Sequence, residues 1–247
     1  MSAGTSGRSE TLAKVVQTLR LHQPKHDSDF SAGSISNKDS IVGDSASESV
    51  SSRARSRSQP NRAAVLVCLF EGESGEIRVI LTKRSSAMSS HSGEVALPGG
   101  RWEEGDENDA ETALREAKEE IGLEPSAVEI ITILEPYHTK RNIIVYPVVG
   151  VLWDKNGFNP APNATEVESV FDVPLEMFLK NENRREQAGE LMGYKFTVQL
   201  FDYQTKNTTY VIWALTAAIL IKTASVVFQR PPAFEERAPV FWGRSRH

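Results

Sequence analysis

The chain has 247 residues, of which 39% are hydrophobic and 25% charged, and its formal net charge is −5. This length allows one large domain or two small ones with a sizeable core. The mildly acidic balance argues against a nucleic-acid or anionic-membrane partner, and the longest apolar run, 210–221, is too short to cross a bilayer. The single cysteine, Cys68, excludes an intramolecular disulfide, indicates a reducing compartment, and lies in an apolar run that predicts a buried thiol.

Residues 1–61 are predicted to be a mostly disordered arm with one short helix at 9–21. In this stretch apolar residues recur at helical spacing, Ser9 can cap the helix and Pro24 ends it. We favour a helix that docks on the domain over the alternative, a basic organelle transit peptide. Residues 26–59 are rich in Ser, Asp and Gly, and the Arg-Ser run that ends this stretch is interpreted as solvated linker rather than an RNA contact.

The remaining sequence predicts one mixed α/β domain at 62–240, followed by a tail at 241–247. The elements alternate without an internal repeat, and turn residues separate them. In chain order they are a hairpin at 63–70 and 77–84, a short strand at 93–101, a helix at 109–121, strands at 128–136 and 142–153, a strand leading into a short helix at 167–180, a hairpin at 194–213 and a closing helix at 214–228.

The helix at 109–121 combines an apolar stripe with an acidic face. Small and aliphatic residues at spacings of three and four form the stripe, and Gly122 ends the helix. Glu116, Glu119 and Glu120 lie at i, i+3 and i+4, so they share the opposite face, which we expect to point away from the core. Arg115 should offset little of their repulsion, because residues i and i+1 do not face each other.

An acidic helix face alone is as well explained by solvation as by chemistry. A divalent cation such as Mg²⁺ or Mn²⁺ would convert the repulsion into coordination, because both prefer hard oxygen ligands. The preceding loop, LPGGRWEEGDEND, favours this second reading. Its two glycines leave backbone groups open to a ligand, and Asp106 or Glu107 could return toward the acidic face.

The segment GGRWEEGDENDAETALREAKEEIGL resembles the Nudix box, whose pattern is G-x5-E-x7-REUxEExGU. Gly100 begins the match, and Asp106 replaces the usual glutamate, with eight residues before Arg115 instead of seven. Upstream, ILTKRSSAMSSHSGEVALPGG resembles the motif of the coenzyme A diphosphatase branch, with Ser89 in place of an expected arginine and Leu97 in place of a phenylalanine. The similarity continues over roughly 62–240, where the sequence resembles plant Nudix hydrolases of the fifteen-like group.

This resemblance implies a Nudix-type α/β/α sandwich with a mixed sheet and a catalytic loop-helix. It also implies metal-dependent cleavage of coenzyme A, and of acyl derivatives such as succinyl- or malonyl-coenzyme A, to 3',5'-ADP and (acyl-)4'-phosphopantetheine. The metal would be Mg²⁺ or Mn²⁺. The residues carried over are Glu116, Glu119 and Glu120 as catalytic metal ligands with the Gly100 carbonyl, Arg115 to orient them, Arg84, Ser85, His91 and Arg101 for substrate, and Glu166 and Asp106 as further candidates.

Several alternatives stay open at this point. The general base is unassigned, although Glu120 is expected to be an indispensable ligand. Another nucleotide diphosphate, such as ADP-ribose, guanosine tetraphosphate or an oxidised nucleotide, is the second substrate hypothesis. A non-catalytic binding module ranks last, because all the glutamates are present. We expect a small-molecule substrate, no nucleic acid or membrane partner, and a cytoplasmic protein with mitochondrial as the alternative; a homo-oligomer is left open. Trp213 and Phe228 are expected in the core.

Overall fold

A computed structural model describes residues 9–22, 61–88, 90–191 and 193–243 of the chain. The Arg-Ser run at 51–59 and Ser89, which the sequence singled out, lie outside these residues. Within the described part of the chain, no helix is long and apolar enough to cross a membrane.

The central sheet is mixed and is built around two parallel strands, β1 (Arg62–Glu71) and β7 (Ile144–Leu152). Both are apolar along most of their length, as expected for strands covered on both faces. The main path runs β3-β2-β1-β7-β5, with β4 paired to β1, β6 to β7 and β8 to β2. The other strands of this sheet are β2 (Ile77–Arg84), β3 (Val95–Ala96), β4 (Gly99–Arg101), β5 (Val128–Ile133), β6 (Tyr137–His138) and β8 (Val167–Pro174).

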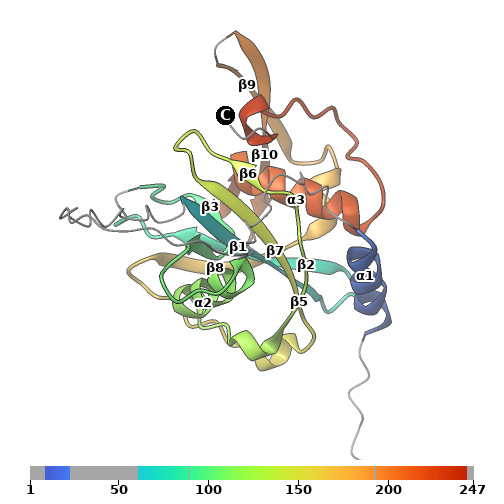
Figure 1. Cartoon of the computed structure of the whole chain (residues 1–247). Helices are drawn as coiled ribbons and strands as arrows, with labels where there is room; N and C mark the ends of the chain where they lie inside the picture. The colour runs from blue at the N-terminus through green and yellow to red at the C-terminus, as the bar shows by residue number, and fades with distance from the viewer. Residues whose placement is uncertain (1–8, 23–60, 89, 192, 244–247) are drawn as a thin grey trace, which may run out of the picture.

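A second, antiparallel sheet has the order β11-β10-β9. The predicted hairpin at 194–213 is confirmed as β10 (Tyr194–Gln204) and β11 (Thr209–Trp213). The sequence did not predict its third strand, β9 (Arg184–Leu191). The two long strands β9 and β10 project from the body of the molecule (Figure 1).

Helices cover both faces of the central sheet, which confirms the predicted α/β/α arrangement (Figure 1). β1 shows the division, because successive side chains point to opposite faces. Leu66 and Cys68 pack with α2 (Asp109–Ile121), whereas Val67 and Leu69 pack with α1 (Glu10–Leu21) and α3 (Ala214–Val227). Short 3₁₀ turns link the strands: η1 (Pro125–Ala127), η2 (Lys155–Gly157), η3 (Leu175–Leu179) and η4 (Val240–Gly243).

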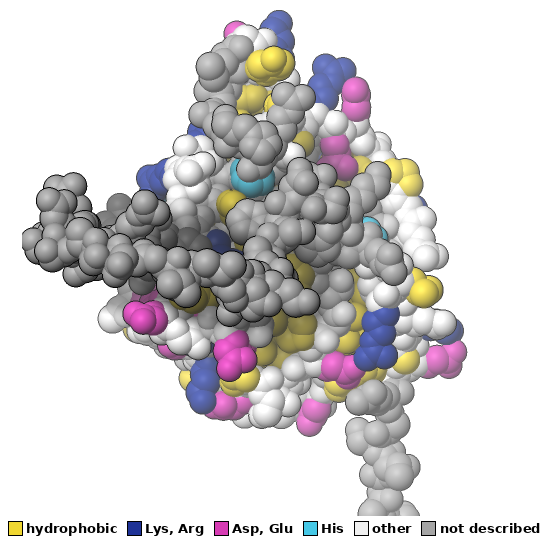
Figure 2. Space-filling view, in the orientation of Figure 1, with side chains coloured by type: hydrophobic (Ala, Val, Ile, Leu, Met, Phe, Trp, Pro, Cys, Tyr) yellow, Lys and Arg dark blue, Asp and Glu magenta, His cyan; other side chains and the backbone are white. Residues whose placement is uncertain are grey.

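Helix α1 is part of the domain core. Its stripe of Leu12, Val15, Val16 and Leu19 is buried in the same cluster as α3. The Ser9 side chain accepts a hydrogen bond from the Leu12 N–H at 3.1 Å and so caps the helix, as the sequence indicates. On the face shown in Figure 2, acidic and basic side chains are interspersed around the rim rather than gathered into one field.

Candidate active site

The acidic helix α2 is fixed at both ends by its own sequence. The Asn108 side chain accepts from the Glu111 N–H at 3.1 Å, and Gly122 adopts a left-handed φ of 71° that ends the helix. Arg62 on β1 donates to Asp109 at 2.9 Å and ties the first turn to the sheet. With Ala117 buried on the sheet, the acidic residues are held along the edge of α2 nearest to β4.

The expectation that the acidic face is solvent-exposed is wrong for Glu120. Glu120 is only 3% exposed, and one of its carboxylate oxygens accepts the Gly99 N–H at 3.2 Å. The Glu116 side chain is 14% exposed, whereas that of Glu119 is 58% exposed. The cause is tertiary, because β4, which contains Gly99 and Gly100, covers two of the three glutamates and leaves the third in solvent.

Two glycines make this close approach possible. A Cβ on Gly99, whose φ is 154°, would collide with the Ala64 carbonyl and the backbone of Val65. A Cβ on Gly100 would collide with the carboxylate of Glu116. The glycine pair therefore lets β4 lie against β1 on one side and lets a carboxylate lie against the main chain on the other.

Burial and mutual repulsion disturb the ionisation of these carboxylates. The pKa of Glu120 is raised to about 7, mainly by burial. The hydrogen bond from the Gly99 N–H and the charge of Arg84 act in the opposite direction and lower this pKa, whereas the charges of Glu116 and Glu166 raise it further. Burial also raises the pKa of Glu116, against the opposing effect of Arg115. The nearest positive charge to Glu120 is the Arg84 guanidinium, at 3.7 Å. Glu120 therefore lies in a buried region where Arg84 is the cation that opposes its negative charge.

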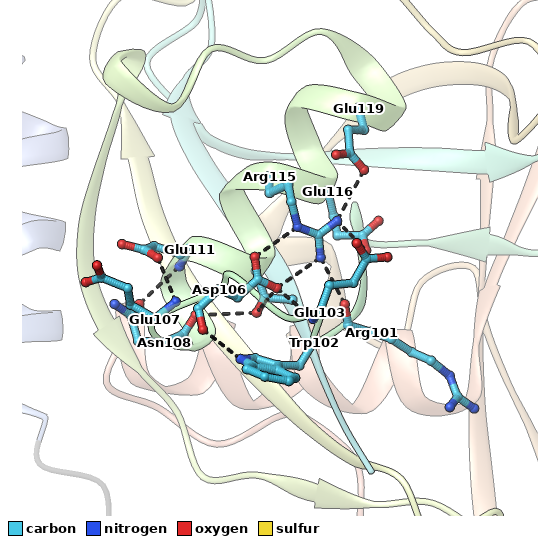
Figure 3. Close-up of polar contacts among 11 residues, drawn as sticks. Arg101, Trp102, Glu103, Asp106, Glu107, Asn108, Glu111, Arg115, Glu116 and Glu119 are labelled. Carbon is cyan, nitrogen blue, oxygen red and sulfur yellow. Dashed lines mark hydrogen bonds and ion pairs between the residues drawn. The ribbon is translucent and has the colours of Figure 1, made fainter. Parts of the chain in front are cut away.

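Arg115 lies at the centre of a second polar cluster, on the outer side of α2 (Figure 3). It donates to both oxygens of Asp106, at 2.9 and 3.1 Å, and to the Arg101 carbonyl at 3.0 Å. It also donates to Glu116 at 3.1 Å and Glu119 at 3.2 Å. The expectation that Arg115 offsets little of the repulsion is therefore wrong, because its long side chain lies back over the helix and reaches both carboxylates.

Asp106 does return from the loop, as the sequence allowed. Arg115 holds the pKa of this carboxyl at about 2. The same carboxylate accepts from the Thr112 hydroxyl at 2.9 Å and the Glu103 N–H at 3.0 Å. Asp106 thus holds the loop and the Arg115 side chain in place, and its hydrogen-bond partners within the described chain do not include Glu120.

A cavity of about 290 Å³ adjoins the glutamates across the glycine pair. It lies on the α3 face of the sheet, and its walls are mostly apolar side chains of β1, β7 and the start of α3. Polar groups at its margin are Arg84, His91 and Glu94, and Gly99 and Gly100 complete it. The carboxylates and the cavity therefore occupy opposite faces of the sheet and meet at β4.

The predicted substrate residues are only partly brought together. Arg84 and His91 line the cavity; His91 has a left-handed φ of 55° and its Nδ1 lies 2.8 Å from Glu94. Ser85 is buried, accepts the Ala87 N–H at 3.3 Å and does not line the cavity. The Arg101 side chain extends away from Arg115 and its neighbours in Figure 3 and is also absent from the cavity wall.

Sequence reasoning missed three features of the site: the Gly99 N–H bonded to Glu120, Glu94 at the cavity margin, and Trp213. Trp213 was expected in the core with Phe228. Phe228 does pack against the core, but Trp213 lines the cavity instead. Trp213 precedes an apolar helix, so its pattern resembled that of a core residue, and only the tertiary structure shows that it lines a cavity.

The donor set fits a divalent cation in its chemistry. Glu116 and Glu120 are desolvated carboxylates that lie beside Gly100 and Gly99 respectively, and hard oxygen ligands of this kind suit Mg²⁺ and Mn²⁺. Across the described ranges, however, no three His, Cys, Asp or Glu side chains are already grouped as a metal site. Glu119 is held by Arg115 instead.

A larger cavity, of about 600 Å³, lies away from these residues, between α1, the β1–β2 turn and η3. It is lined by Thr11, Glu76, Glu176 and Lys180 among others, and none of the predicted site residues contributes to it. The smaller cavity is the functional candidate, because it alone adjoins the coupled carboxylates.

Comparison with known families agrees with this geometry. The family model described as the NUDIX domain matches residues 60–192, more than half of the chain. The chain belongs to the Nudix hydrolase family. Its members act on pyrophosphate bonds and generally need a divalent cation such as Mg²⁺ or Mn²⁺. The predicted fold class and family are thereby confirmed.

Three relatives show how far the Nudix domain match extends. Nudix hydrolase 15, mitochondrial, of Arabidopsis thaliana is 60% identical over 185 residues, which is 75% of this chain but only 65% of that protein. Nudix hydrolase 22, chloroplastic, of the same plant is 52% identical over 237 residues, 94% of this chain and 78% of that protein. The peroxisomal coenzyme A diphosphatase NUDT7 of Mus musculus is 37% identical over 177 residues, 71% of this chain and 74% of that protein.

Proposed function

We propose that the enzyme hydrolyses the diphosphate of coenzyme A and its acyl derivatives to 3',5'-ADP and (acyl-)4'-phosphopantetheine. The observation that carries this proposal is that Glu116 and Glu120 lie against the glycines of β4, directly beside a cavity that Arg84 lines. The similarity to a mouse protein named as a coenzyme A diphosphatase supports this substrate class. The upstream motif from Leu81 to Gly100 supports it independently.

In this proposal Glu116, Glu119 and Glu120 hold the Mg²⁺ or Mn²⁺ ion, with the Gly100 carbonyl as a further ligand. When bound, the ion neutralises the phosphate oxygens and lowers the pKa of water. Glu119 is the most exposed of the three and is paired with Arg115, so its contribution should be the smallest.

The chain's own residues have separate tasks. Arg84 presents positive charge to the diphosphate from the cavity side, and Arg115 orients Glu116 and Glu119 from the other side. Water attacks one phosphorus and the bridging P–O bond breaks. The proton of that water passes to a carboxylate, for which Glu120 and Glu166 are both candidates. Most of the rate then comes from positioning and electrostatics.

A substrate panel tests the proposal. Purified full-length enzyme is assayed with Mg²⁺ or Mn²⁺ against coenzyme A, succinyl- and malonyl-coenzyme A, ADP-ribose and guanosine tetraphosphate. We expect the highest kcat/KM for the coenzyme A group, with 3',5'-ADP as the shared product. A kcat/KM at least about tenfold higher for ADP-ribose or guanosine tetraphosphate would replace this proposal with the second substrate hypothesis.

The cellular site and assembly state are further parts of the proposal. We propose a cytoplasmic enzyme, with mitochondrial as the alternative, acting on a small molecule without a nucleic-acid or membrane partner; a homo-oligomer stays open. The relatives' names place those proteins in mitochondria, chloroplasts and peroxisomes. Imaging of a fluorescent fusion to the C-terminus, with size-exclusion chromatography and light scattering, tests both points.

A further inference from the structure

Trp213 differs from the other tryptophans of the described chain in having no partner for its ring or its N–H. Trp102 donates to the Asp106 carbonyl at 2.9 Å, and Trp153 donates to Glu129 at 2.8 Å. Trp242 packs edge-on against Tyr137. Among the described residues, the Trp213 indole has no hydrogen-bond acceptor and no aromatic neighbour. A buried or half-buried tryptophan usually finds such a partner.

Trp213 lines the cavity together with Gly99 and Gly100. Trp213 is the last residue of β11, where it pairs with Leu200 of β10. The next residue, Ala214, has a left-handed φ of 52° and is the first residue of α3, which no side chain caps. The backbone of Trp213 is therefore held by a paired strand on one side and a helix on the other, which fixes the place of this residue in the cavity wall before a ligand binds.

The size of the cavity limits its occupant to part of the substrate. Its volume is about 290 Å³, whereas sites that enclose a whole drug-sized ligand are roughly 300–1,000 Å³. Coenzyme A is larger than that. Gly99 and Gly100 line the cavity, and the Glu116 carboxylate lies against Gly100. The occupant is therefore the group attached next to the reacting phosphates.

Two groups of coenzyme A meet that condition: adenosine and the pantetheine arm. The arm carries two amides, and each would need hydrogen-bond partners in walls that are mostly apolar, including Val65, Val145 and Ile219. A purine offers two apolar faces and keeps its polar atoms at its edge. The uncapped first turn of α3, at Leu215 and Thr216, presents backbone N–H groups at this wall to the ring nitrogens.

We propose that Trp213 is a specificity-determining residue, whose indole stacks on the purine base of the substrate inside this cavity. The inference rests on the proposed function in one respect, namely that the substrate contains an adenosine diphosphate group. It assigns the base half of the molecule to the α3 face and leaves the pantetheine half outside the cavity.

The test uses two small ligands, each of which represents one half of coenzyme A. Binding of 5'-AMP and of 4'-phosphopantetheine to the full-length enzyme is measured by calorimetry with Mg²⁺ present. The variants are Trp213→Leu, which removes the ring, and Trp213→Phe, which keeps an aromatic face. The matched control is Trp153→Phe, because Trp153 contacts Glu129 and packs against the core away from the cavity.

Base–aromatic stacking predicts about 10- to 100-fold weaker 5'-AMP binding in Trp213→Leu, and a smaller loss in Trp213→Phe. Binding of 4'-phosphopantetheine should not change in any variant. For hydrolysis of coenzyme A, KM should rise while kcat changes little, because the base is remote from the P–O bond that breaks. Unchanged 5'-AMP binding, or a loss confined to 4'-phosphopantetheine, would overturn the proposal.

Fluorescence provides a second readout that does not depend on the leucine variant folding. 5'-AMP should quench the intrinsic fluorescence of the wild type and of Trp153→Phe, but not that of Trp213→Phe. Equal quenching in all three proteins would also overturn the assignment. If 5'-AMP binding depends on Trp213 while coenzyme A is not hydrolysed, then the proposed function fails and the base site stands. The two hypotheses are thus distinguishable.

Discussion

The two long helices on either side of the sheet are built in different ways. Helix α2 is capped by Asn108 and Gly122, carries a charged edge and places coupled carboxylates at β4. Helix α3 is apolar, begins without a side-chain cap after Trp213, and forms the wall of a cavity. The comparison shows that charge chemistry and apolar binding are assigned to opposite faces of one sheet, and that Gly99 and Gly100 join them.

This separation has a physical advantage. Burial already raises the pKa of Glu120 to about 7, so an apolar wall packed directly against this carboxylate would raise the cost of its charge further. With the cavity on the other face, residues that contact the bound molecule can differ without altering the desolvation of Glu116 and Glu120. The predictions below test whether the two faces are independent in this sense.

The largest effect is expected for Glu120→Gln on the α2 face. The substitution keeps the shape but removes the charge, so kcat/KM with saturating Mg²⁺ should fall by about 10²–10³-fold. Steady-state kinetics measures this loss. Glu119→Gln is the matched control and should lose much less, because Glu119 is exposed and paired with Arg115. Near wild-type activity in Glu120→Gln would refute the assignment of the site.

Glu120→Gln should be at least as stable to unfolding as the wild type, because the raised pKa of Glu120 makes its charge destabilising in the folded state. The pKa of Glu120 is raised to about 7 in the folded state, above the value of roughly 4.3 in an unfolded chain. Above the unfolded pKa, a carboxyl shifted in this direction increasingly destabilises the folded state as pH rises toward 7. In metal-free buffer at pH 8, Glu120→Gln should therefore have a melting temperature equal to or above that of the wild type.

Part of this site could be predicted from the sequence, and α2 shows which features are predictable. Its apolar stripe, its glycine terminus and its acids are local signals, so the predicted span of 109–121 is confirmed. The burial of Glu120 depends on where β4 lies, which no local pattern contains. Similarly, β9 has the sequence RREQAGEL, whose polar residues lack the alternation of a half-buried strand. Trp213 was misassigned because core and cavity positions share the same apolar pattern.

On the opposite face of the sheet, where α1 packs with α3, substitutions should change the stability of the fold rather than the rate of catalysis. Leu19 of α1 is fully buried in the cluster that contains α3, at 0% exposed. Leu19→Ala should lower the free energy of unfolding by about 3 kcal/mol, since it leaves a cavity in the core. Urea denaturation followed by circular dichroism measures this change. The control, Leu21→Ala, alters a side chain that is 75% exposed and should cost less than about 0.5 kcal/mol.

The kcat of Leu19→Ala tests whether the two faces of the sheet are independent. If the faces are independent, folded Leu19→Ala should retain the wild-type kcat for the best substrate at a temperature below its transition. A fall in kcat as large as that of Glu120→Gln would show instead that the packing of α1 on α3 controls the carboxylate geometry.

The smallest effect is expected on the outer side of α2, where Asp106 is committed to structure. Asp106→Asn removes the charge that Arg115 holds, with a side chain only 6% exposed. We expect a loss of about 1–2 kcal/mol in the free energy of unfolding at pH 7, less than the full linkage value because nearby solvent screens the pair. Urea denaturation of both proteins between pH 7 and pH 3 measures it.

The pH dependence identifies the cause of that loss. The pKa of Asp106 is lowered to about 2 in the folded protein, below its unfolded value of roughly 3.9. The stabilisation is therefore complete above pH 5 and disappears as pH falls through 4 toward 2, so the difference between wild type and Asp106→Asn should shrink over that range. A difference that stays constant with pH would mean that hydrogen-bond geometry, rather than the charge of Asp106, holds Arg115 over the α2 glutamates.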